Sequence, residues 1–386
     1  MAAHGDAART VAGVAADGTD PRHLLAVLAW TVRPRHTTDG LRRRCREDGI
    51  SLTDGDAPAA LAAAAGQPRA DLLAPAAEIA ATWRRLGVRV ALVGDPGYPP
   101  RLAAGWPHLD APTLLAWRGT PPVDQPAVGV VGARRATGYG QGVAAWLAES
   151  VARAGARVVS GGAHGVDAAA HEASLEEPGG TTVVLGCGHA VGYPRDHARE
   201  DGLFDRVVAH GGTLVSELLP FQPVHPGTVR ARNRIVAGLA DVVVVVEGRE
   251  GSGALLTASA AADRGRTVLA VPGDVRAPGS TAPHQLLAEG AAPCTSPADV
   301  LRALGGAPAA TPADADTDAA PEAVSPLPAD AHRVLAESWP RPVRTDDLAR
   351  LADLPPGRLL AALTRARVAG VVAESAEGVR LRRPPR

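Results

Sequence analysis

Three arginines at alternate positions carry the clearest chemical signal in this chain of 386 residues. Arg230, Arg232 and Arg234, with Asn233 among them, lie in a segment that is predicted to be helical and has no acidic neighbour. A guanidinium group binds phosphate through two hydrogen bonds and stacks on bases, whereas an exposed helix face usually carries charges of both signs. The segment therefore predicts a site for phosphate groups.

Small residues follow most of the predicted strands. The runs are Gly-Ala-Arg-Arg at 132–135, Ser-Gly-Gly-Ala-His-Gly-Val-Asp at 160–167, Gly-Cys-Gly at 186–188, Glu-Gly-Arg-Glu-Gly-Ser-Gly-Ala at 247–254 and Pro-Gly at 272–273. Small residues let a ligand approach the backbone closely, and N–H groups at the start of a helix attract anions. A tight turn between a strand and a helix would explain any single one of these glycines without a ligand. The whole row, with Arg134 and Arg135 beside it, predicts several neighbouring anion sites.

Short apolar runs alternate with helical segments from residue 126 onward. The predicted strands are 127–131, 157–159, 181–185, 213–215, 241–246 and 267–271, preceded by extended segments at 88–94 and 107–119. The predicted helices are 139–154, 166–175, 198–209, 229–239, 254–264 and 283–288. Most strands are continuously apolar, as in a parallel sheet that is buried on both faces. The alternation predicts an α/β fold with a Rossmann-like, doubly wound parallel sheet, and ligands of such sheets lie at the carboxyl ends of the strands.

Composition divides the chain into five regions. They are a flexible N-terminus at 1–19, a small helical (SAM-like) domain at 20–87, the extended Rossmann-like domain at 88–305, an Ala/Pro/Asp-rich linker at 306–328 and a winged-helix domain at 329–386. The linker composition cannot bury a core. The last region is predicted to contain helices at 331–337, 345–351 and 355–371, followed by a hairpin of 371–374 and 379–382.

The overall composition excludes several classes of protein. The basic residues are all arginine, 40 against 41 acidic residues, so the formal net charge is −1. The apolar runs are far shorter than the ~20 residues of a membrane-spanning helix, and the polar residues within 1–20 argue against a secretory signal. Cys45, Cys187 and Cys294 match neither a disulfide framework nor a zinc site. We expect a cytoplasmic protein with reduced thiols and no membrane contact.

No cofactor, metal or catalytic site is predicted. The turn after 127–131 departs from the Gly-x-Gly-x-x-Gly dinucleotide fingerprint, and a chain without lysine cannot supply a phosphate-loop lysine. Ser160, His164 and Asp167 lie within one turn and form no recognisable nucleophile arrangement, although Asp167 is suited to capping the following helix. The histidines considered as metal ligands lack ligand spacing, namely His171, His189 and His197.

Aromatic residues that could stack on bases are few. Tyr139, Tyr193 and Phe221 are the ones near the predicted site, and each is expected to belong to the core rather than to face a ligand. We therefore expect phosphate contacts to outweigh stacking, and the affinity for a nucleic acid to fall steeply with salt.

An ordered set of motifs resembles the DNA-processing protein A family (DprA, also called Smf). The segments are GDPGYPPRL at 94–102, VVGAR at 130–134, VSGGAHGVDAAAH at 159–171, LGCG at 185–188, YP at 193–194, SE at 216–217, RNRIVAGL at 232–239, Glu247 with GSGALLTA at 251–258, and VPG at 271–273. Each motif alone is weak, whereas their order over 92–301 is specific.

This resemblance implies a protein without enzymatic activity that binds single-stranded DNA and, as a homodimer, helps to load the RecA recombinase onto it during recombination and DNA uptake. It implies no cofactor. Together with the arginine pattern, it predicts a DNA site made of Gly132, Ala133, Arg134, Arg135, Ser160, Gly161, Gly162, His164, Gly165, Arg230, Arg232, Asn233, Arg234, Gly251, Ser252, Gly253 and Thr257. Ala133 stands where the family usually has Ser, His164 where Arg or Tyr is common, and Val229 where an aromatic residue is usual.

Two other functions compete with this interpretation. Lysine-decarboxylase-like nucleotide phosphoribohydrolases share a similar sheet, but the loop at 251–254 is followed by no acidic residue before Asp263. A winged-helix regulator would read duplex DNA through 329–386, with Arg358, Arg365 and Arg367 on the predicted recognition helix. Release of a base from nucleoside monophosphates would identify the first, and loss of duplex binding on deletion of 329–386 the second.

Overall fold

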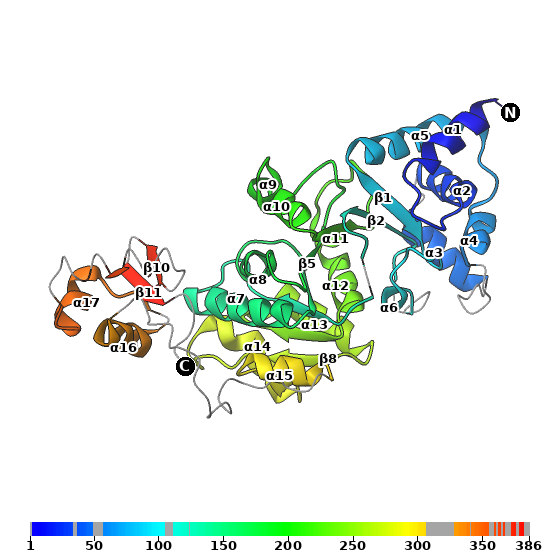
Figure 1. The fold of residues 1–386 in the computed structure, drawn as a ribbon. Coiled ribbons are helices and arrows are strands. Elements are labelled where there is room, and N and C mark those ends of the chain that lie inside the picture. Colours follow the sequence, from blue (N-terminus) through cyan, green and yellow to red (C-terminus); the bar gives the residue numbers. More distant parts are fainter. Residues whose placement is uncertain are drawn as a thin grey trace, which may run out of the picture.

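A sheet of nine strands forms the centre of the part of the chain that the structure describes (Figure 1). This computed structural model describes residues 2–33, 37–48, 57–104, 111–122, 124–305, 328–339, 341–354, 359, 362–363, 366, 372–375 and 378–381. The strands are β1 (Val88–Leu92), β2 (Leu114–Gly119), β3 (Ala127–Val131), β4 (Arg157–Ser160), β5 (Thr181–Val184), β6 (Thr213–Ser216), β7 (Val242–Val245), β8 (Thr267–Ala270) and β9 (Ala292–Pro293). Their order is β1-β2-β6-β5-β4-β3-β7-β8-β9, with β1 and β2 antiparallel to their neighbours and the others parallel.

Alternate residues of the parallel strands enter two different cores. In β7, Val242 and Val244 pack among residues of α7 (Gly138–Arg153), α8 (Val166–Ser174) and α15 (Pro297–Ala303). Val243 and Val245 pack on the opposite face, among residues of α12 (Asn233–Leu239) and α13 (Gly253–Ala262). Both faces of the sheet are thus covered, which explains why β7 consists only of valine.

The strand order reverses beside β3. The chain runs from β3 outward through β4, β5 and β6, and then returns to place β7 on the other side of β3. The segments that follow β3 and β7 therefore diverge to opposite faces of the sheet and leave a crevice between them. Doubly wound sheets bind their ligands at this switch point.

The structure confirms the α/β fold and places each predicted parallel strand within about two residues of its expected bounds. Two predicted helices are interrupted. The segment 198–209 becomes α9 (Arg195–Ala198) and α10 (Leu203–Ala209), and 229–239 becomes α11 (Pro226–Ala231) and α12. The remaining helices beside the sheet are α6 (Pro100–Ala103), the 3-10 turn η2 (Pro278–Ser280) and α14 (Thr281–Ala288).

Residues 2–19 form a helix and a segment that pairs with the sheet, which differs from the flexible stretch expected at 1–19. Helix α1 (Ala2–Ala12) packs on α5 (Ala70–Arg85), and its Val11 is fully buried. Residues 14–16 then pair with β1, because the Val90 N–H donates to the Val14 carbonyl at 2.8 Å. These contacts tie the segment to the rest of the chain.

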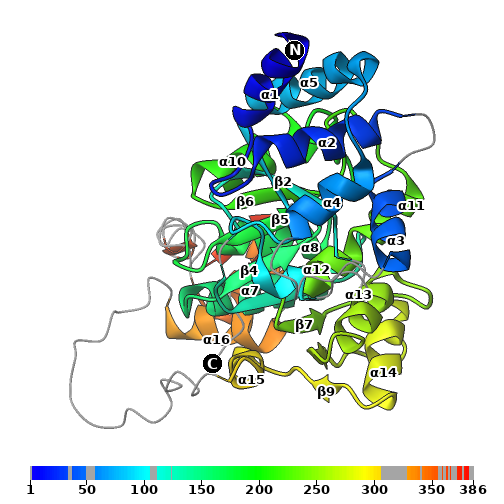
Figure 2. The same ribbon diagram turned by 90° about the vertical axis from the view of Figure 1, so that its right-hand side faces the viewer.

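Four further helices share this core. They are α2 (Pro21–Thr31), α3 (Thr38–Glu47), α4 (Ala57–Ala65) and α5. The helices α1–α5 gather beside β1 and β2 (Figures 1 and 2). One buried cluster contains residues of these helices, of both strands and of α12, so the packing continues across the expected boundary at 87–88.

The C-terminal region has a core of its own. Its described elements are α16 (Ala329–Ser338), α17 (Thr345–Leu351) and the antiparallel pair β10 (Val372–Ser375) and β11 (Gly378–Leu381), whose buried residues form a separate cluster. The winged helix expected at 329–386 stays a prediction. The predicted recognition helix lies mostly outside the described residues, as does the expected linker, so both stay predictions. Within the described ranges, no helix combines the length and apolarity needed to cross a bilayer.

Candidate nucleic-acid interface

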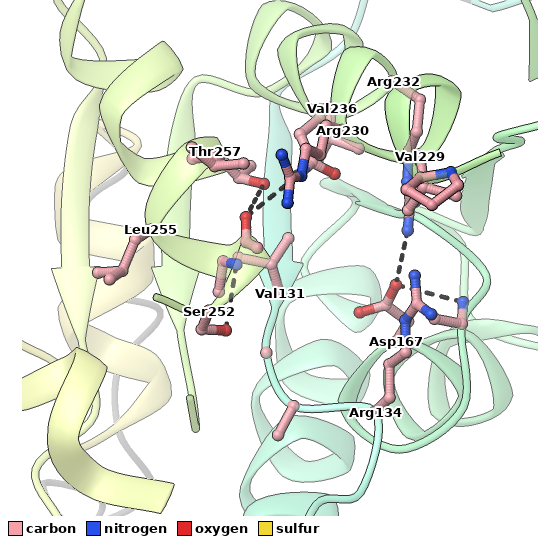
Figure 3. A pocket seen from close by; sticks show the side chains of 18 of the residues that line it. Val131, Arg134, Asp167, Val229, Arg230, Arg232, Val236, Ser252, Leu255 and Thr257 are labelled. Carbon is pink, nitrogen blue, oxygen red and sulfur yellow. Dashed lines mark hydrogen bonds and ion pairs between the residues drawn. The ribbon is translucent and has the colours of Figure 1, made fainter. Parts of the chain in front are cut away.

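An open groove of about 800 Å³ lies at the switch point of the sheet (Figure 3). It is bounded by the segment after β3, the segment after β4, helix α11 and the start of α13. The lining residues are Val131, Gly132, Ala133, Arg134, Ala163, Asp167, Tyr193, Val224, His225, Pro226, Val229, Arg230, Arg232, Asn233, Val236, Gly251, Ser252, Gly253, Ala254, Leu255, Leu256 and Thr257.

The segment that carries Arg134 is fixed by a carboxylate from another strand. Glu247, directly after the valine run of β7, accepts hydrogen bonds from the Thr137 backbone N–H at 2.9 Å and from the Thr137 hydroxyl at 2.5 Å. The same hydroxyl accepts the Gly140 N–H at 3.1 Å and so caps α7. A negative charge at a helix start is stabilising. Glu247 thereby holds residues 132–137 between the switch-point strands.

The start of α13 forms the opposite side of the groove. Ser252 caps this helix by accepting the Ala254 N–H at 3.3 Å. The Asn233 amide donates to the Gly253 carbonyl at 3.1 Å, which joins α12 to the first turn of α13. Asn233 and Thr257 are buried, so these predicted site residues shape the groove more than they face a ligand.

Helix α11 brings an exposed cation to the rim. His225 caps this helix, with Nδ1 accepting the Gly227 N–H at 3.0 Å while the Thr228 hydroxyl accepts the His225 N–H at 3.0 Å. The Arg230 side chain then projects from the last turn of α11 and is exposed. Arg134 is exposed on the facing segment (Figure 3). Neither guanidinium has a hydrogen-bond or ion-pair partner among the residues described.

Arg232 lies between α11 and α12 and points into the protein. Its guanidinium donates to the Val184 carbonyl at the end of β5 at 3.1 Å and lies 3.5 Å from an Asp167 carboxylate oxygen (Figure 3). Burial lowers the pKa of Arg232 from its ordinary value, and the Asp167 charge acts in the opposite direction. A Cβ at Gly161 would lie 1.1 Å from Nη1 of Arg232. Gly161 therefore makes room for this arginine rather than for a ligand.

Several other predicted site residues are placed away from the groove. Arg234 forms a 2.7 Å ion pair with Glu217, and both side chains are largely buried. The Ser160 hydroxyl donates to the Val130 carbonyl at 2.6 Å within the sheet. Added Cβ atoms would clash with neighbouring atoms at Gly162 and Gly165. Arg135 and His164 are exposed but do not line the groove.

The groove unites ten of the predicted residues from three stretches of the chain. They are Gly132, Ala133, Arg134, Arg230, Arg232, Asn233, Gly251, Ser252, Gly253 and Thr257. Its described lining contains three arginines and one carboxylate, Asp167, so its charge is positive on a nearly neutral chain. Such a surface attracts polyanions. Asp167 is already paired with Arg232 and with the Ala163 N–H at 3.3 Å.

Aromatic residues are more accessible than the sequence suggests. Tyr193 lines the groove and is 42% exposed, and Phe221 is 64% exposed, so the expectation that both belong to the core is wrong. Tyr139 is partly buried and donates its hydroxyl proton to the Pro272 carbonyl at 2.9 Å. Sequence reasoning also missed His225 and Leu256 as lining residues. For His225 the Pro-Gly pair that follows it was the available signal, whereas Leu256 had none.

The chain is similar in sequence to several known proteins. The sequence profile described as DNA recombination-mediator protein A matches residues 89–305. A relative from Mycobacterium tuberculosis is 39% identical over 256 residues, covering 65% of this chain and 63% of the relative. The DNA processing protein DprA of Bacillus subtilis is 34% identical over 224 residues, covering 58% of this chain and 73% of that protein.

A solved structure has a similar fold. The X-ray structure of DNA processing protein A from Streptococcus pneumoniae aligns with a TM-score of 0.57 and 27% identity, covering 73% of this chain and 97% of that one. The chain spans less than two thirds of the length of its mycobacterial relative. The matched profile covers the sheet from the second residue of β1 to β9 and every segment that lines the groove. The resemblance in the motifs is confirmed, and the chain belongs to the DNA recombination-mediator protein A family.

Proposed function

We propose that this protein binds single-stranded DNA in the groove at the switch point and acts as a recombination mediator without catalysing a reaction. The observation that carries the proposal is the pair of exposed guanidinium groups, Arg134 and Arg230, on opposite rims of a positively charged groove. Arginine binds phosphate with directed hydrogen bonds. Two such groups on facing walls suit a sugar-phosphate backbone lying between them.

Exposed aromatic rings favour an unpaired strand over a duplex. Tyr193 lies in the groove wall. Phe221 is an exposed side chain in the segment that leads into α11. Unpaired bases stack on such rings, whereas the bases of a duplex are already stacked on one another. The N–H of Gly253, the first residue of α13 and part of the groove lining, adds a further contact for phosphate.

The partners of the proposed activity follow from family membership. The family description names recombination mediation, and the similar proteins are named DNA processing proteins. We extend the proposal to a cytoplasmic homodimer that helps to load RecA onto the bound strand. Faster RecA-dependent strand exchange in the presence of the protein would support this step, and an unchanged rate would contradict it.

The groove offers little to a phosphoribohydrolase. Such an enzyme needs an available carboxylate at the sugar, and Asp167, the one carboxylate in the described lining, is paired with Arg232. Incubation with nucleoside monophosphates should therefore release no free base. Detected release would replace the proposed function by an enzymatic one.

Arginine substitutions test the proposal directly. Fluorescence anisotropy with a labelled oligo(dT) strand should show weaker binding for Arg134→Ala and Arg230→Ala, and about tenfold weaker binding for the double variant. Because each lost phosphate contact on a single strand removes about 0.7 from the slope of log K against log salt, the double variant should lose about 1.4. The matched control is Arg43→Ala, an exposed arginine on α3 outside the groove. Equal affinity of the double variant and the control would refute the proposal.

A further inference from the structure

Two histidines and an aspartate meet outside the groove. His164 follows β4 in the 161–165 turn, while Asp196 and His197 belong to α9, and one ligand atom from each lies within 4.8 Å of the other two. His164 Nε2 is 3.5 Å from Asp196 Oδ1, and His197 Nε2 is 3.9 Å from Asp196 Oδ2. The imidazole rings are perpendicular neighbours with centroids 4.6 Å apart.

A backbone contact determines which nitrogen of His197 is available. Its Nδ1 lies 3.0 Å from the Gly162 carbonyl oxygen. Because a carbonyl can only accept, Nδ1 must carry a proton, and in the neutral ring the lone pair is on Nε2. That lone pair faces the Asp196 carboxylate. A proton on Nε2 or a metal ion between the two groups would relieve their repulsion.

We propose that His164, Asp196 and His197 form a binding site for a divalent transition-metal ion of the zinc class. Two imidazoles and a carboxylate are ligands that zinc uses in sites with open positions, whereas magnesium and calcium prefer oxygen ligands alone. A ring N–H donated to a backbone carbonyl is also the usual outer contact of a metal-binding histidine.

The site is partly arranged in advance. The His197 side chain is only 12% exposed and packs edge-on against Phe204, with centroids 5.8 Å apart, so its ring is held in place. The side chains of His164 and Asp196 are 53% and 59% exposed. Both can change rotamer to reach the ~2.0 Å bonds that zinc requires.

A bound ion would join two segments that border the groove. His164 follows Ala163, and Asp196 lies close in sequence to Tyr193, and both Ala163 and Tyr193 line the groove. The ion would link the turn after β4 to α9 and neutralise Asp196. The motif resemblance offers no such role, because His164 stands where Arg or Tyr is common. The site does not depend on the proposed DNA binding.

Zinc titration of the full chain tests the site without DNA. Competition with a chromophoric chelator should show one zinc ion per chain with a micromolar or lower Kd, and no measurable binding of magnesium. His164→Gln and Asp196→Asn should each weaken zinc binding at least tenfold. The matched control is His210→Gln, because His210 is an exposed histidine 3.9 Å from one carboxylate, Glu176, and belongs to no three-ligand cluster among the residues that the structure describes. This variant should bind zinc as the wild type does.

Thermal unfolding gives a second readout. Zinc should raise the Tm of the wild type and of His210→Gln, because an ion that binds only the folded state stabilises it, and should leave the Tm of His164→Gln unchanged. His197→Gln would also remove packing of the His197 ring inside the protein, which could lower stability by itself. The variants at the exposed positions, His164→Gln and Asp196→Asn, therefore decide the outcome. Absence of stoichiometric zinc binding, or wild-type binding by His164→Gln and Asp196→Asn, would overturn the site. DNA binding can be measured in the presence of a chelator. Failure of the zinc site would therefore leave the proposed DNA binding standing.

Discussion

At the residue scale, the guanidinium group of Arg232 occupies the space above Gly161 and contacts the end of β5. The sequence places Arg232 in the predicted phosphate site, since the spacing of arginines cannot show which of them faces inward. In the structure Arg232 is buried, whereas Arg230, two residues earlier, is exposed. Helix periodicity alone could not assign these roles, because the helix breaks between α11 and α12.

Gly161→Ala should destabilise the protein by about 3 kcal/mol, because the new methyl group must displace a buried cation from its partners. Urea denaturation measures the change. Gly138→Ala is the control, since Gly138 has open space around its Cβ position and a negative φ in the first turn of α7. The control should be within about 0.5 kcal/mol of wild type, and equal stability of both variants would contradict the assignment of Gly161.

Two histidines, the buried His171 and the partly buried His189, should make the fold sensitive to acid. Burial lowers the pKa of His171 to about 3 and that of His189 to about 4. Between these values and the ordinary value near 6.5, the unfolded chain binds a proton at each position and the folded chain does not. The contribution of these two histidines to the free energy of unfolding is therefore greatest above pH 6.5. It falls as the pH decreases below 6.5, by about 1.4 kcal/mol per pH unit for each histidine.

The variant His171→Asn isolates one of these contributions. The asparagine amide can replace the contact of Nδ1 with the Thr181 hydroxyl, which is 2.7 Å in the wild type. Between pH 6.5 and 5.0 the loss of unfolding free energy should be about 2 kcal/mol smaller in the variant than in the wild type. Urea denaturation at the two pH values gives both losses, and identical losses would show that His171 is not the responsible group.

At the element scale, the carboxylate of Glu247 connects β7 to the start of α7. Glu247→Gln keeps the shape of the side chain but removes its negative charge. One of the two carboxylate oxygens that accept hydrogen bonds from Thr137 becomes an NH₂ group, which cannot accept. We expect a loss of about 1–2 kcal/mol in unfolding free energy. Glu250→Gln changes the same charge at an exposed position of the following turn and should be neutral. If both variants were equally stable, Glu247 would not be the cap of this helix junction.

Elements with strong local signals are predictable from the sequence, and those set by distant contacts are not. The valine run of β7 identifies a strand buried on both faces, and the row of glycines identifies the ends of strands near the groove. Helix α1 was missed because its apolar residues are few, and its order comes from packing on α5, far along the chain. The meeting of His164 with Asp196 likewise depends on the tertiary fold, since the two are far apart in sequence.

At the scale of the whole molecule, the C-terminal region and the sheet have separate cores. The buried cluster of the C-terminal region consists of residues between 331 and 381, and the other clusters contain none of them. A chain that ends after Gly305 should therefore fold, with its Tm within a few degrees of the full chain, and should keep its affinity for oligo(dT) within about twofold, since the charges of the groove are unchanged.

Duplex binding distinguishes the roles of the two regions. If the C-terminal region reads duplex DNA, the shortened chain should lose affinity for a duplex and keep its affinity for the single strand. More than tenfold loss of single-strand affinity would instead place part of the DNA site beyond residue 305. Anisotropy titrations with both oligonucleotides at two salt concentrations separate these outcomes.

The position of Arg232 has a consequence for how the groove works over time. The arginine joins the segment between α11 and α12 to the end of β5 and, through Asp167, to α8. The segment between α11 and α12 cannot move away from β5 and α8 without stripping a buried cation of its partners, which is costly. We therefore expect this side of the opening to keep its position before any polymer arrives. If the groove holds single-stranded DNA as proposed, we expect a slender chain to enter at first encounter and a thick one to be turned away, with no slow closing motion in between.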